Sequence, residues 1–445
     1  LLHRREAAGC AGVCAPRGRT IRMSVTDRLV ACILEAAPSE DACAVMRLSL
    51  YDWMACGMGG VAEPVSQVMR DHALGNGGVP AARLFGGGDV PARAAALANG
   101  AISHALDYDD THFDHVGHPS VAVFPAVTAI GTSDGDALVE AALIGAEVSV
   151  RVGMWLGANH YNLGFHQTAT AGAFGATAAV ARLWGMTPSQ TAHAFGVAST
   201  KAAGLRSQFG TMGKPLNAGL AAECGVIAAD LVACGLVSDP DGFDGPQGFV
   251  ATHAGQRNGR AFEGLGDQWL MEGVSHKLHA CCHGLHAMIN AFEDAYASHE
   301  AVTAIEVRTS PRWLNVCNIA APTTGLEAKF SYAHVAAMVL HGWDTTRIDS
   351  FTDSCAADPD LAVTRAKVRV VGDDNLPETA AKVIVDLADG SGREGAFDLG
   401  DVHDPDGTVD ALRRKGRGLV GDREGALWNA TARQVDPDAL RDLMG

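Results

Sequence analysis

The sequence of 445 residues is short of positive charge. It has 34 lysines and arginines against 51 acidic residues, a formal net charge of -17, and no run of basic residues. Such a chain repels phosphate backbones and anionic membrane surfaces. No stretch reaches the roughly 18 consecutive apolar residues that a membrane-spanning helix needs. We therefore expect a protein that binds neither nucleic acid nor membranes.

Motifs for metals and organic cofactors are also missing. No G-x-G-x-x-G motif opens a strand–helix–strand unit and no G-x-x-x-x-G-K-S/T loop is present, so nothing indicates a nucleotide cofactor. The 11 cysteines are scattered, without a C-x-x-C pair for zinc or the spaced triplet of an iron–sulfur dehydratase. Because an odd, irregular set of cysteines in a long chain argues against a secreted disulfide scaffold, we expect a reducing, cytoplasmic location.

Residues 1–22 differ in composition from the rest of the chain. They contain five arginines and one acidic residue, and no apolar region of the kind found in secretory signals. Because Met23 and the residues after it read like a natural start, we interpret residues 1–22 as upstream or non-native sequence. A mitochondrial leader is the alternative, and only that alternative would change the expected location.

Residues 23–264 have helical patterns almost throughout. Thr187 and Gln190 have the spacing of a helix N-terminal capping box. Glycines lie among alanines in apolar stretches such as residues 171–176, which allows helix backbones to approach closely. Alternation typical of strands is nearly absent there. We therefore predict a large, all-helical domain.

Strand-like alternation begins after residue 264. It occurs at residues 302–308, 367–371 and 381–387, with helical segments between them. We therefore predict a smaller α+β domain over residues 265–400. The last segment, 401–445, is expected to be helical and to return to the first domain. The fold class is thus mainly α.

The densest polar cluster occupies residues 103–120, with four histidines and four aspartates. Asp107 and Thr111 are four residues apart and would share one face if the preceding helix continued through them. A histidine beside a buried carboxylate can act as a general acid or base. The same residue types are metal ligands, so a metal centre is an alternative. A solvated, capped loop is the third interpretation.

Three further segments place a cation or a proton carrier in an apolar setting. His166 opens an Ala/Gly-rich helix, Lys214 precedes a proline at a helix start, and Lys277 lies ahead of another helix. Considered alone, His166 is typical of a histidine whose ring nitrogens are hydrogen-bonded within the fold. Lys214, considered alone, is typical of a lysine in contact with solvent. Backbone amides at a helix start would nevertheless attract an anion together with a lysine. The pattern therefore favours acid/base chemistry on a small anion, without a bound cofactor.

Taken together and in this order, the segments resemble the MmgE/PrpD family. That family includes 2-methylcitrate dehydratase, cis-aconitate decarboxylase and iminodisuccinate epimerase. The matching stretches are residues 99–111 (NGAISHALDYDDT), 118–120 (HPS), 164–166 (GFH), 209–216 (FGTMGKPL), 219–222 and 277–286.

The resemblance implies a large helical domain, a smaller α+β lid domain, a homodimer, and an active site between the domains that uses no metal or organic cofactor. The motif positions imply six catalytic residues: Asp107, Thr111, His118, His166, Lys214 and Lys277. We expect four further residues to contact the substrate: His104, Arg206, Asn217 and His334. Asn217 stands where the family often has histidine, and His334 where decarboxylase-like members have tyrosine.

We expect a cofactor-independent lyase of the dehydratase or decarboxylase type, acting on a small di- or tricarboxylate by removal of a proton α to a carboxylate. Lys214 and Lys277 would bind carboxylates and stabilise the developing charge. One of His118 and His166 would remove the proton, and Asp107 would orient an imidazole. An iminodisuccinate-type epimerase in the same site is the alternative. Alternatives of other classes are a metal-dependent hydrolase and a non-catalytic carboxylate-binding protein.

Overall fold

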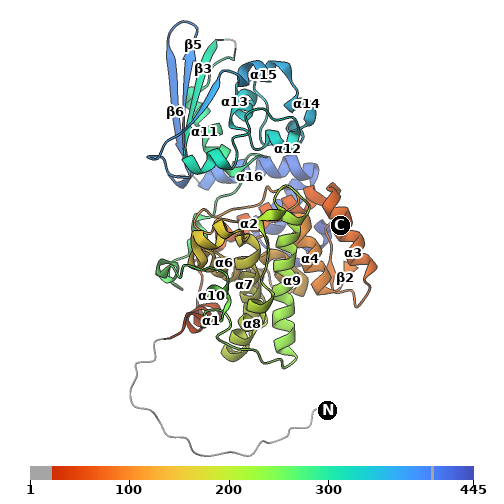
Figure 1. The fold of residues 1–445 in the computed structure, drawn as a ribbon. Helices are drawn as coiled ribbons and strands as arrows, with labels where there is room; N and C mark the ends of the chain where they lie inside the picture. The colour runs from red at the N-terminus through yellow and green to blue at the C-terminus, as the bar shows by residue number, and fades with distance from the viewer. Residues whose placement is uncertain (1–22, 300, 402–404) are drawn as a thin grey trace, which may run out of the picture.

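The computed structural model describes residues 23–299, 301–401 and 405–445. Residues 1–22 lie outside this described part, so their interpretation stays a prediction. The described chain is mainly helical and has a four-stranded mixed sheet, which confirms the predicted fold class. In Figure 1 the helical part lies below and the sheet with its helices above, and α16 (Pro405–Val420) passes between them.

The helical part is built from the N-terminal half of the chain. Its helices are α1 (Val25–Glu35), α2 (Glu40–Gly59), α3 (Pro64–Gly75), α4 (Ala92–Ser103), α5 (Val123–Ile130), α6 (Gly135–Leu163), α7 (Gln167–Leu183), α8 (Pro188–Lys201) and α9 (Gly213–Ala233). Thr187 and Gln190 form the predicted capping box of α8. A short two-stranded ribbon, β1 (Ala82–Arg83) with β2 (Asp89–Val90), departs from the all-helical prediction.

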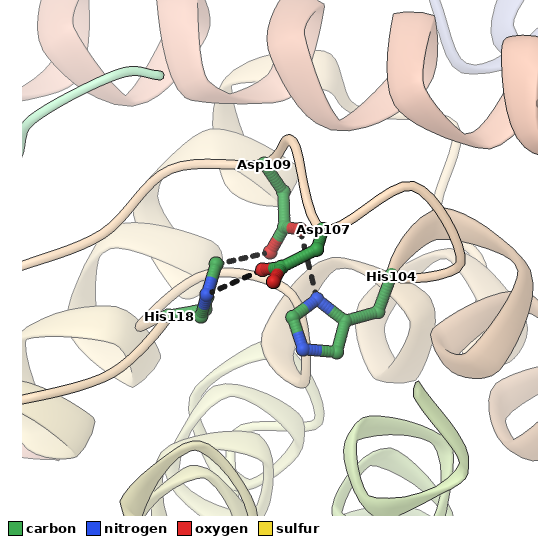
Figure 2. Close-up of side chains that lie close together, drawn as sticks. All are labelled: His104, Asp107, Asp109 and His118. Atoms are coloured by element: carbon green, nitrogen blue, oxygen red, sulfur yellow. Dashed lines mark hydrogen bonds and ion pairs between the residues drawn. The ribbon is translucent and has the colours of Figure 1, made fainter. Parts of the chain in front are cut away.

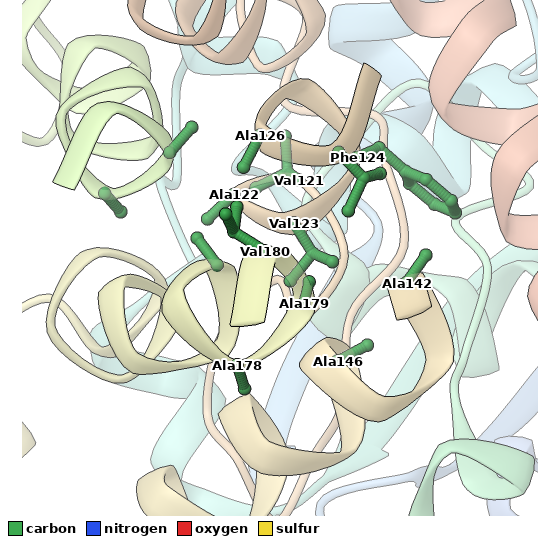
Figure 3. Close-up of a cluster of buried hydrophobic side chains, with 14 of the residues drawn as sticks. Val121, Ala122, Val123, Phe124, Ala126, Ala142, Ala146, Ala178, Ala179 and Val180 are labelled. Atoms are coloured by element: carbon green, nitrogen blue, oxygen red, sulfur yellow. The ribbon is translucent and has the colours of Figure 1, made fainter. Parts of the chain in front are cut away.

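Small side chains fill the core between the central helices. Figure 3 shows Val123 and Phe124 of α5 together with Ala142 and Ala146 of α6 and Val180 of α7. All five side chains are fully buried. Alanine at so many core positions lets the helix axes approach more closely than larger side chains would permit.

Helix α9 has the length and hydropathy of a membrane span, and 67% of that stretch is buried inside the protein. It packs against α4, α7 and α8. Burial on this scale is typical of the central helix of a folded domain, whose apolar surface contacts other helices on most sides.

Two glycines bring α4 and α9 into backbone contact. A Cβ placed on Gly100 of α4 would lie 2.7 Å from the Cα of Gly219 on α9. A Cβ on Gly219 would in turn clash with the carbonyl oxygen of Leu97. The helices therefore cross here at a distance that only glycine permits.

We expect Gly219→Ala to destabilise the protein by about 1–3 kcal/mol, because the added methyl group must displace the main chain of α4. Thermal denaturation should show a melting temperature lower by several degrees. Gly418→Ala is the matched control, since a Cβ at Gly418 in α16 meets nothing within 4 Å. Alanine is the better helix former, so the control should melt at the wild-type temperature or above it. Equal melting of all three proteins would contradict a close crossing.

The C-terminal part combines a sheet with short helices. Its elements are α11 (His286–Ala295), β3 (Val302–Thr309), α12 (Gly325–Ala328), α13 (Tyr332–Leu340), α14 (Asp353–Ala356), α15 (Pro359–Arg365), β4 (Val368–Gly372), β5 (Ala380–Leu387) and β6 (Gly392–Asp398). The strand order is β4-β3-β5-β6. β3 pairs with β4 in parallel, and the other two pairs are antiparallel. β3, β4 and β5 coincide with the predicted alternating segments, whereas β6 was not predicted.

The last helices connect the two parts. α16, α17 (Glu424–Trp428) and α18 (Pro437–Met444) all pack against α2 in the helical part. Leu419 of α16 contacts the hydrophobic cores of both parts. α16 is therefore held by the helical part on one side and by the sheet part on the other (Figure 1).

Candidate active site

The loop after α4 carries the carboxylates of the site. α4 ends at Ser103, and Asp107 has a left-handed backbone conformation with φ of 51°. Aspartate adopts this conformation more readily than most non-glycine residues do. The helix that would have placed Asp107 and Thr111 on one face stops before both residues, so they do not share a helix face.

Asp107 lies between two ammonium groups and an imidazole. Its Oδ1 is 2.6 Å from Lys214 Nζ, 3.0 Å from Lys277 Nζ and 3.2 Å from His118 Nε2. Lys277 also donates to the main-chain oxygen of Asp107 at 2.8 Å. Burial raises the pKa of Asp107, but Lys214 and Lys277 outweigh burial and hold the pKa well below its usual range. The carboxylate is therefore ionised.

His118 is held between two carboxylates. Its Nδ1 lies 2.9 Å from Asp109 Oδ2, and the other oxygen of Asp109 is 2.8 Å from His104 Nδ1 (Figure 2). Burial lowers the pKa of His118, but the charge of Asp109 and the contacts with Asp107 raise it above its ordinary value. Burial lowers the pKa of His104 to about 4. His118 is thus the more basic imidazole of the pair, and His104 the less basic one.

His166 approaches the cluster from the start of α7. Its ring lies 6.4 Å from the ring of His104, and its Nδ1 is 3.1 Å from Nδ2 of Asn217 on α9. Asn217 also donates to the carbonyl of Leu205 at 3.3 Å, so this amide nitrogen is the donor to His166 as well. Burial and the charge of Lys214 keep the pKa of His166 well below its ordinary value. His166 is therefore neutral, with its proton on Nε2.

Thr111 contacts His283, a histidine that was not among the predicted site residues. Its Oγ1 lies 2.6 Å from His283 Nδ1, and His283 Nε2 lies 3.1 Å from Ser275 Oγ. The main chains of Thr111 and Ser275 also pair with each other. Thr111 thus connects the loop after α4 to the segment that carries Lys277.

Two predicted substrate-binding residues lie away from the carboxylate cluster. Arg206 donates to the carbonyl of Tyr161 and stacks on its ring, 3.9 Å from the ring centre. His334 is fully buried in α13, with its ring nitrogens 3.5 Å from Cys355 Sγ and 3.3 Å from a guanidinium nitrogen of Arg365. The structure therefore does not bring His334 to the cluster: its ring is packed within the C-terminal part.

The predicted residues that meet at the cluster come from segments far apart in the sequence. They are His104, Asp107, His118, His166, Lys214, Asn217 and Lys277. Asp109 belongs with them, although the sequence analysis named it only as part of the polar stretch. Its partner histidines flank it in the same loop, which is the signal that could have identified it.

The cluster has the ligand types of a metal site but the charge of an anion site. One ligand atom from each of His104, Asp107, Asp109 and His118 lies within 4.8 Å of the others. Two ammonium groups, however, contact Oδ1 of Asp107. Their positive charges repel a cation at this place and attract an anion.

Family models for the MmgE/PrpD N-terminal domain and the MmgE/PrpD C-terminal domain match residues 29–260 and residues 279–429, respectively. The chain belongs to the MmgE/PrpD family. The residues of the cluster thus lie in the first matched region, except Lys277, which lies between the two matched regions.

Three of the curated relatives of this MmgE/PrpD protein are named cis-aconitate decarboxylase or cis-aconitate decarboxylase-like protein. The cis-aconitate decarboxylase-like protein oryM of Aspergillus oryzae is 27% identical over 450 residues, covering 89% of this chain and 90% of that protein. Cis-aconitate decarboxylase of Aspergillus terreus is 30% identical over 264 residues, covering 55% and 54% of the two chains. The human cis-aconitate decarboxylase is 28% identical over 215 residues, covering 46% and 44%. The alignments with the two named decarboxylases thus span about half of each chain.

Proposed function

We propose that this protein is a cofactor-independent lyase that releases CO2 from an unsaturated tricarboxylate such as cis-aconitate. The observation that carries the proposal is an imidazole, His118, that lies between two carboxylates and beside a pair of ammonium groups, Lys214 and Lys277. The names of the relatives support this reaction class. The family also includes dehydratases and epimerases, so the choice among them depends on the site.

The lysine pair supplies the binding site for carboxylate groups of the substrate. In the structure, the carboxylate of Asp107 takes both ammonium groups at 2.6 and 3.0 Å. A substrate carboxylate brought to the same groups would make equally short, charge-assisted contacts. Asp107 has a side chain 34% exposed, the most exposed of these groups, so a substrate entering from solvent meets it first.

Decarboxylation then requires one proton donor. The bond between carbon and the leaving carboxylate breaks, and its electron pair forms a new carbon–carbon double bond. The original double bond shifts its electrons to the far alkene carbon, which takes a proton from His118. The imidazole is left neutral and regains its proton from solvent. Lys214 and Lys277 stabilise the negative charge that builds up on the remaining carboxylates.

The position of the proton on His166 favours decarboxylation over dehydration or epimerisation. Those two reactions begin with removal of a proton by a base. His166 accepts from Asn217 at Nδ1 and carries its own proton on Nε2, so it is a donor towards the site. The pKa of His118 is raised, which favours its protonated form. Both imidazoles therefore support a role as proton donors, as decarboxylation needs.

Incubation with cis-aconitate, citrate, 2-methylcitrate and iminodisuccinate in deuterated water, followed by NMR, tests the proposal. We expect CO2 release from cis-aconitate with one deuterium bound to carbon in the product. Hydration or dehydration without CO2 would assign the dehydratase reaction instead. Exchange of an α-proton without loss of any group would assign an epimerase. Binding of these acids without turnover would leave a carboxylate-binding protein.

The rate should fall as the pH rises. His118 donates a proton only below its pKa, which lies above its ordinary value of 6.5. The kcat/KM should therefore be highest on the acid side of this pKa and decrease through it. Asp109→Asn removes the charge that raises this pKa most, so the decrease should begin at lower pH in the variant.

Measured pH–rate profiles of wild type and Asp109→Asn decide this point. Asp114→Asn is the control, because Asp114 is an exposed carboxylate in the same loop. Its profile should coincide with that of wild type. A kcat/KM that instead rises with pH through the same region would make His118 a base and contradict the assignment.

Turnover should survive removal of metal ions. Dialysis against EDTA, followed by addition of Zn2+ or Mn2+, should leave kcat unchanged, because the ammonium groups disfavour a cation next to Asp107. Loss of turnover with EDTA and its return with one metal would favour the metal-dependent hydrolase. Elemental analysis of the purified protein provides the independent check.

A further inference from the structure

Lys415 is a buried lysine of α16 with three oxygen partners. Its Nζ lies 2.5 Å from Asp52 Oδ1 on α2. It also donates to the carbonyl oxygens of Tyr108 at 2.5 Å and of Lys277 at 2.9 Å. The side chains of Lys415 and Asp52 are each 1% exposed. Burial of a charged group is costly, so such a lysine is retained only where its contacts compensate.

The two carbonyl partners belong to the two segments that carry the catalytic groups. Tyr108 directly follows Asp107, and the other carbonyl is that of Lys277 itself. The Tyr108 hydroxyl donates at 2.9 Å to the carbonyl of Leu278, and the ammonium of Lys415 lies 4.0 Å from the centre of the Tyr108 ring. One ammonium group therefore connects both segments at the points where their catalytic side chains begin.

Asp107 needs such support. Its φ of 51° lies in the left-handed region, which aspartate adopts more readily than most residues but still at some cost. Its carboxylate must also stay within hydrogen-bond distance of both lysines. A displacement of about 1 Å at a catalytic group can lower a rate by about a hundredfold.

The position of Lys415 also connects the site to both parts of the molecule. α16 lies between the sheet part and the helical part (Figure 1), and Leu419, one turn after Lys415, contacts both cores. A shift of α16 relative to α2 would therefore move the carbonyls of Tyr108 and Lys277 with it.

We propose that Lys415 is a positioning residue for the reaction, which fixes Asp107 and Lys277 relative to each other through the main-chain carbonyls of Tyr108 and Lys277. It touches no substrate. The kinetic test of this proposal rests on the proposed function, whereas its NMR test does not require turnover. The ion pair with Asp52 neutralises the ammonium, whereas the two carbonyl contacts position the site.

Lys415→Met and Asp52→Asn separate these two roles. Lys415→Met removes both carbonyl contacts, and we expect kcat/KM to fall by about a hundredfold. In Asp52→Asn the amide oxygen still accepts from Lys415 and the carbonyl contacts remain, so kcat/KM should stay near wild type. Burial already raises the pKa of Asp52 to about 7, which makes the neutral amide a mild replacement. Both variants should lower the melting temperature.

The double variant Asp52→Asn/Lys415→Met decides between positioning and stability alone. It buries no unpaired charge, so its melting temperature should recover relative to Lys415→Met while kcat/KM stays low. If kcat/KM recovered together with the melting temperature, the proposal would be overturned. Lys382→Met is the control, since Lys382 pairs with Glu394 on an exposed face of the sheet. This control should match wild type in both measurements.

NMR titration of labelled histidines gives a readout without turnover. Lys415→Met should lower the pKa of His118, because Asp107 no longer stays 3.2 Å from its Nε2. Asp52→Asn should leave that pKa unchanged. An unchanged His118 pKa in Lys415→Met would overturn the proposal even if no acid were turned over. Absence of turnover in wild type, with the expected His118 shift, would count against the proposed function alone.

Discussion

Replacement of His118 by asparagine is expected to lower kcat by about a thousandfold. His118 lies between two carboxylates that favour its protonated form, Asp107 at 3.2 Å and Asp109 at 2.9 Å. Removal of a positioned proton donor typically costs about 10²–10⁴ in rate. Asparagine keeps a polar side chain near Asp109 but cannot transfer a proton at neutral pH. Release of CO2 from cis-aconitate provides the measurement.

His72→Asn is the matched control for this prediction. His72 is an exposed histidine of α3, whose ring contacts Asn76. This variant should keep the wild-type kcat. Melting curves of both variants show whether each is folded. A folded His118→Asn protein with wild-type turnover would remove His118 from the mechanism and leave His166 as the remaining candidate donor.

Replacement of Lys214 by methionine is expected to lower kcat/KM by about 10²–10³, the usual effect of removing one preorganised donor to a developing negative charge. Lys214 Nζ makes the shortest contact with Asp107, at 2.6 Å. Methionine has a similar length and no charge. Lys277 would still pair with Asp107, so the carboxylate stays ionised and the protein should melt near the wild-type temperature.

The kinetic pattern of Lys214→Met distinguishes binding from catalysis. A rise in KM alone would mean that Lys214 binds the substrate and its transition state equally well. A fall in kcat as well would mean that it acts more strongly in the transition state, which we expect. Lys201→Met, at the exposed end of α8, is the control and should leave both constants unchanged. Unchanged kcat/KM in Lys214→Met would contradict an ammonium pair at the site.

The sequence predicted the helical part and most of the sheet, because periodicity reports which face of an element is buried. β3 has alternating β-branched residues and β5 has alternating buried positions, and both strands coincide with predicted segments. β6 was missed because Gly392–Asp398 has no β-branched residue and only Gly395 is buried. It is a strand because it pairs with β5, which is a tertiary cause that the pattern does not contain.

The site was predicted in part for a similar reason. Motif order identified His118, Lys214 and Lys277, whose side chains meet although about 160 residues separate the first from the last. The preceding helix does not continue through Asp107, whose left-handed conformation no local sequence pattern predicts. Lys415 follows two arginines in a helix and reads as a solvated residue. Only the packing of α16 against α2 shows that it is buried.

The contact between Gly100 and Gly219 has a consequence for the range of acids that can react. Gly100 lies about one helical turn before His104, and Gly219 lies little more than one turn after Lys214. The two main chains are in contact at this crossing. A change of side-chain size there therefore cannot adjust the distance between the carboxylate loop and Lys214. The acids that react must therefore fit the spacing that the two main chains set between the carboxylate loop and Lys214.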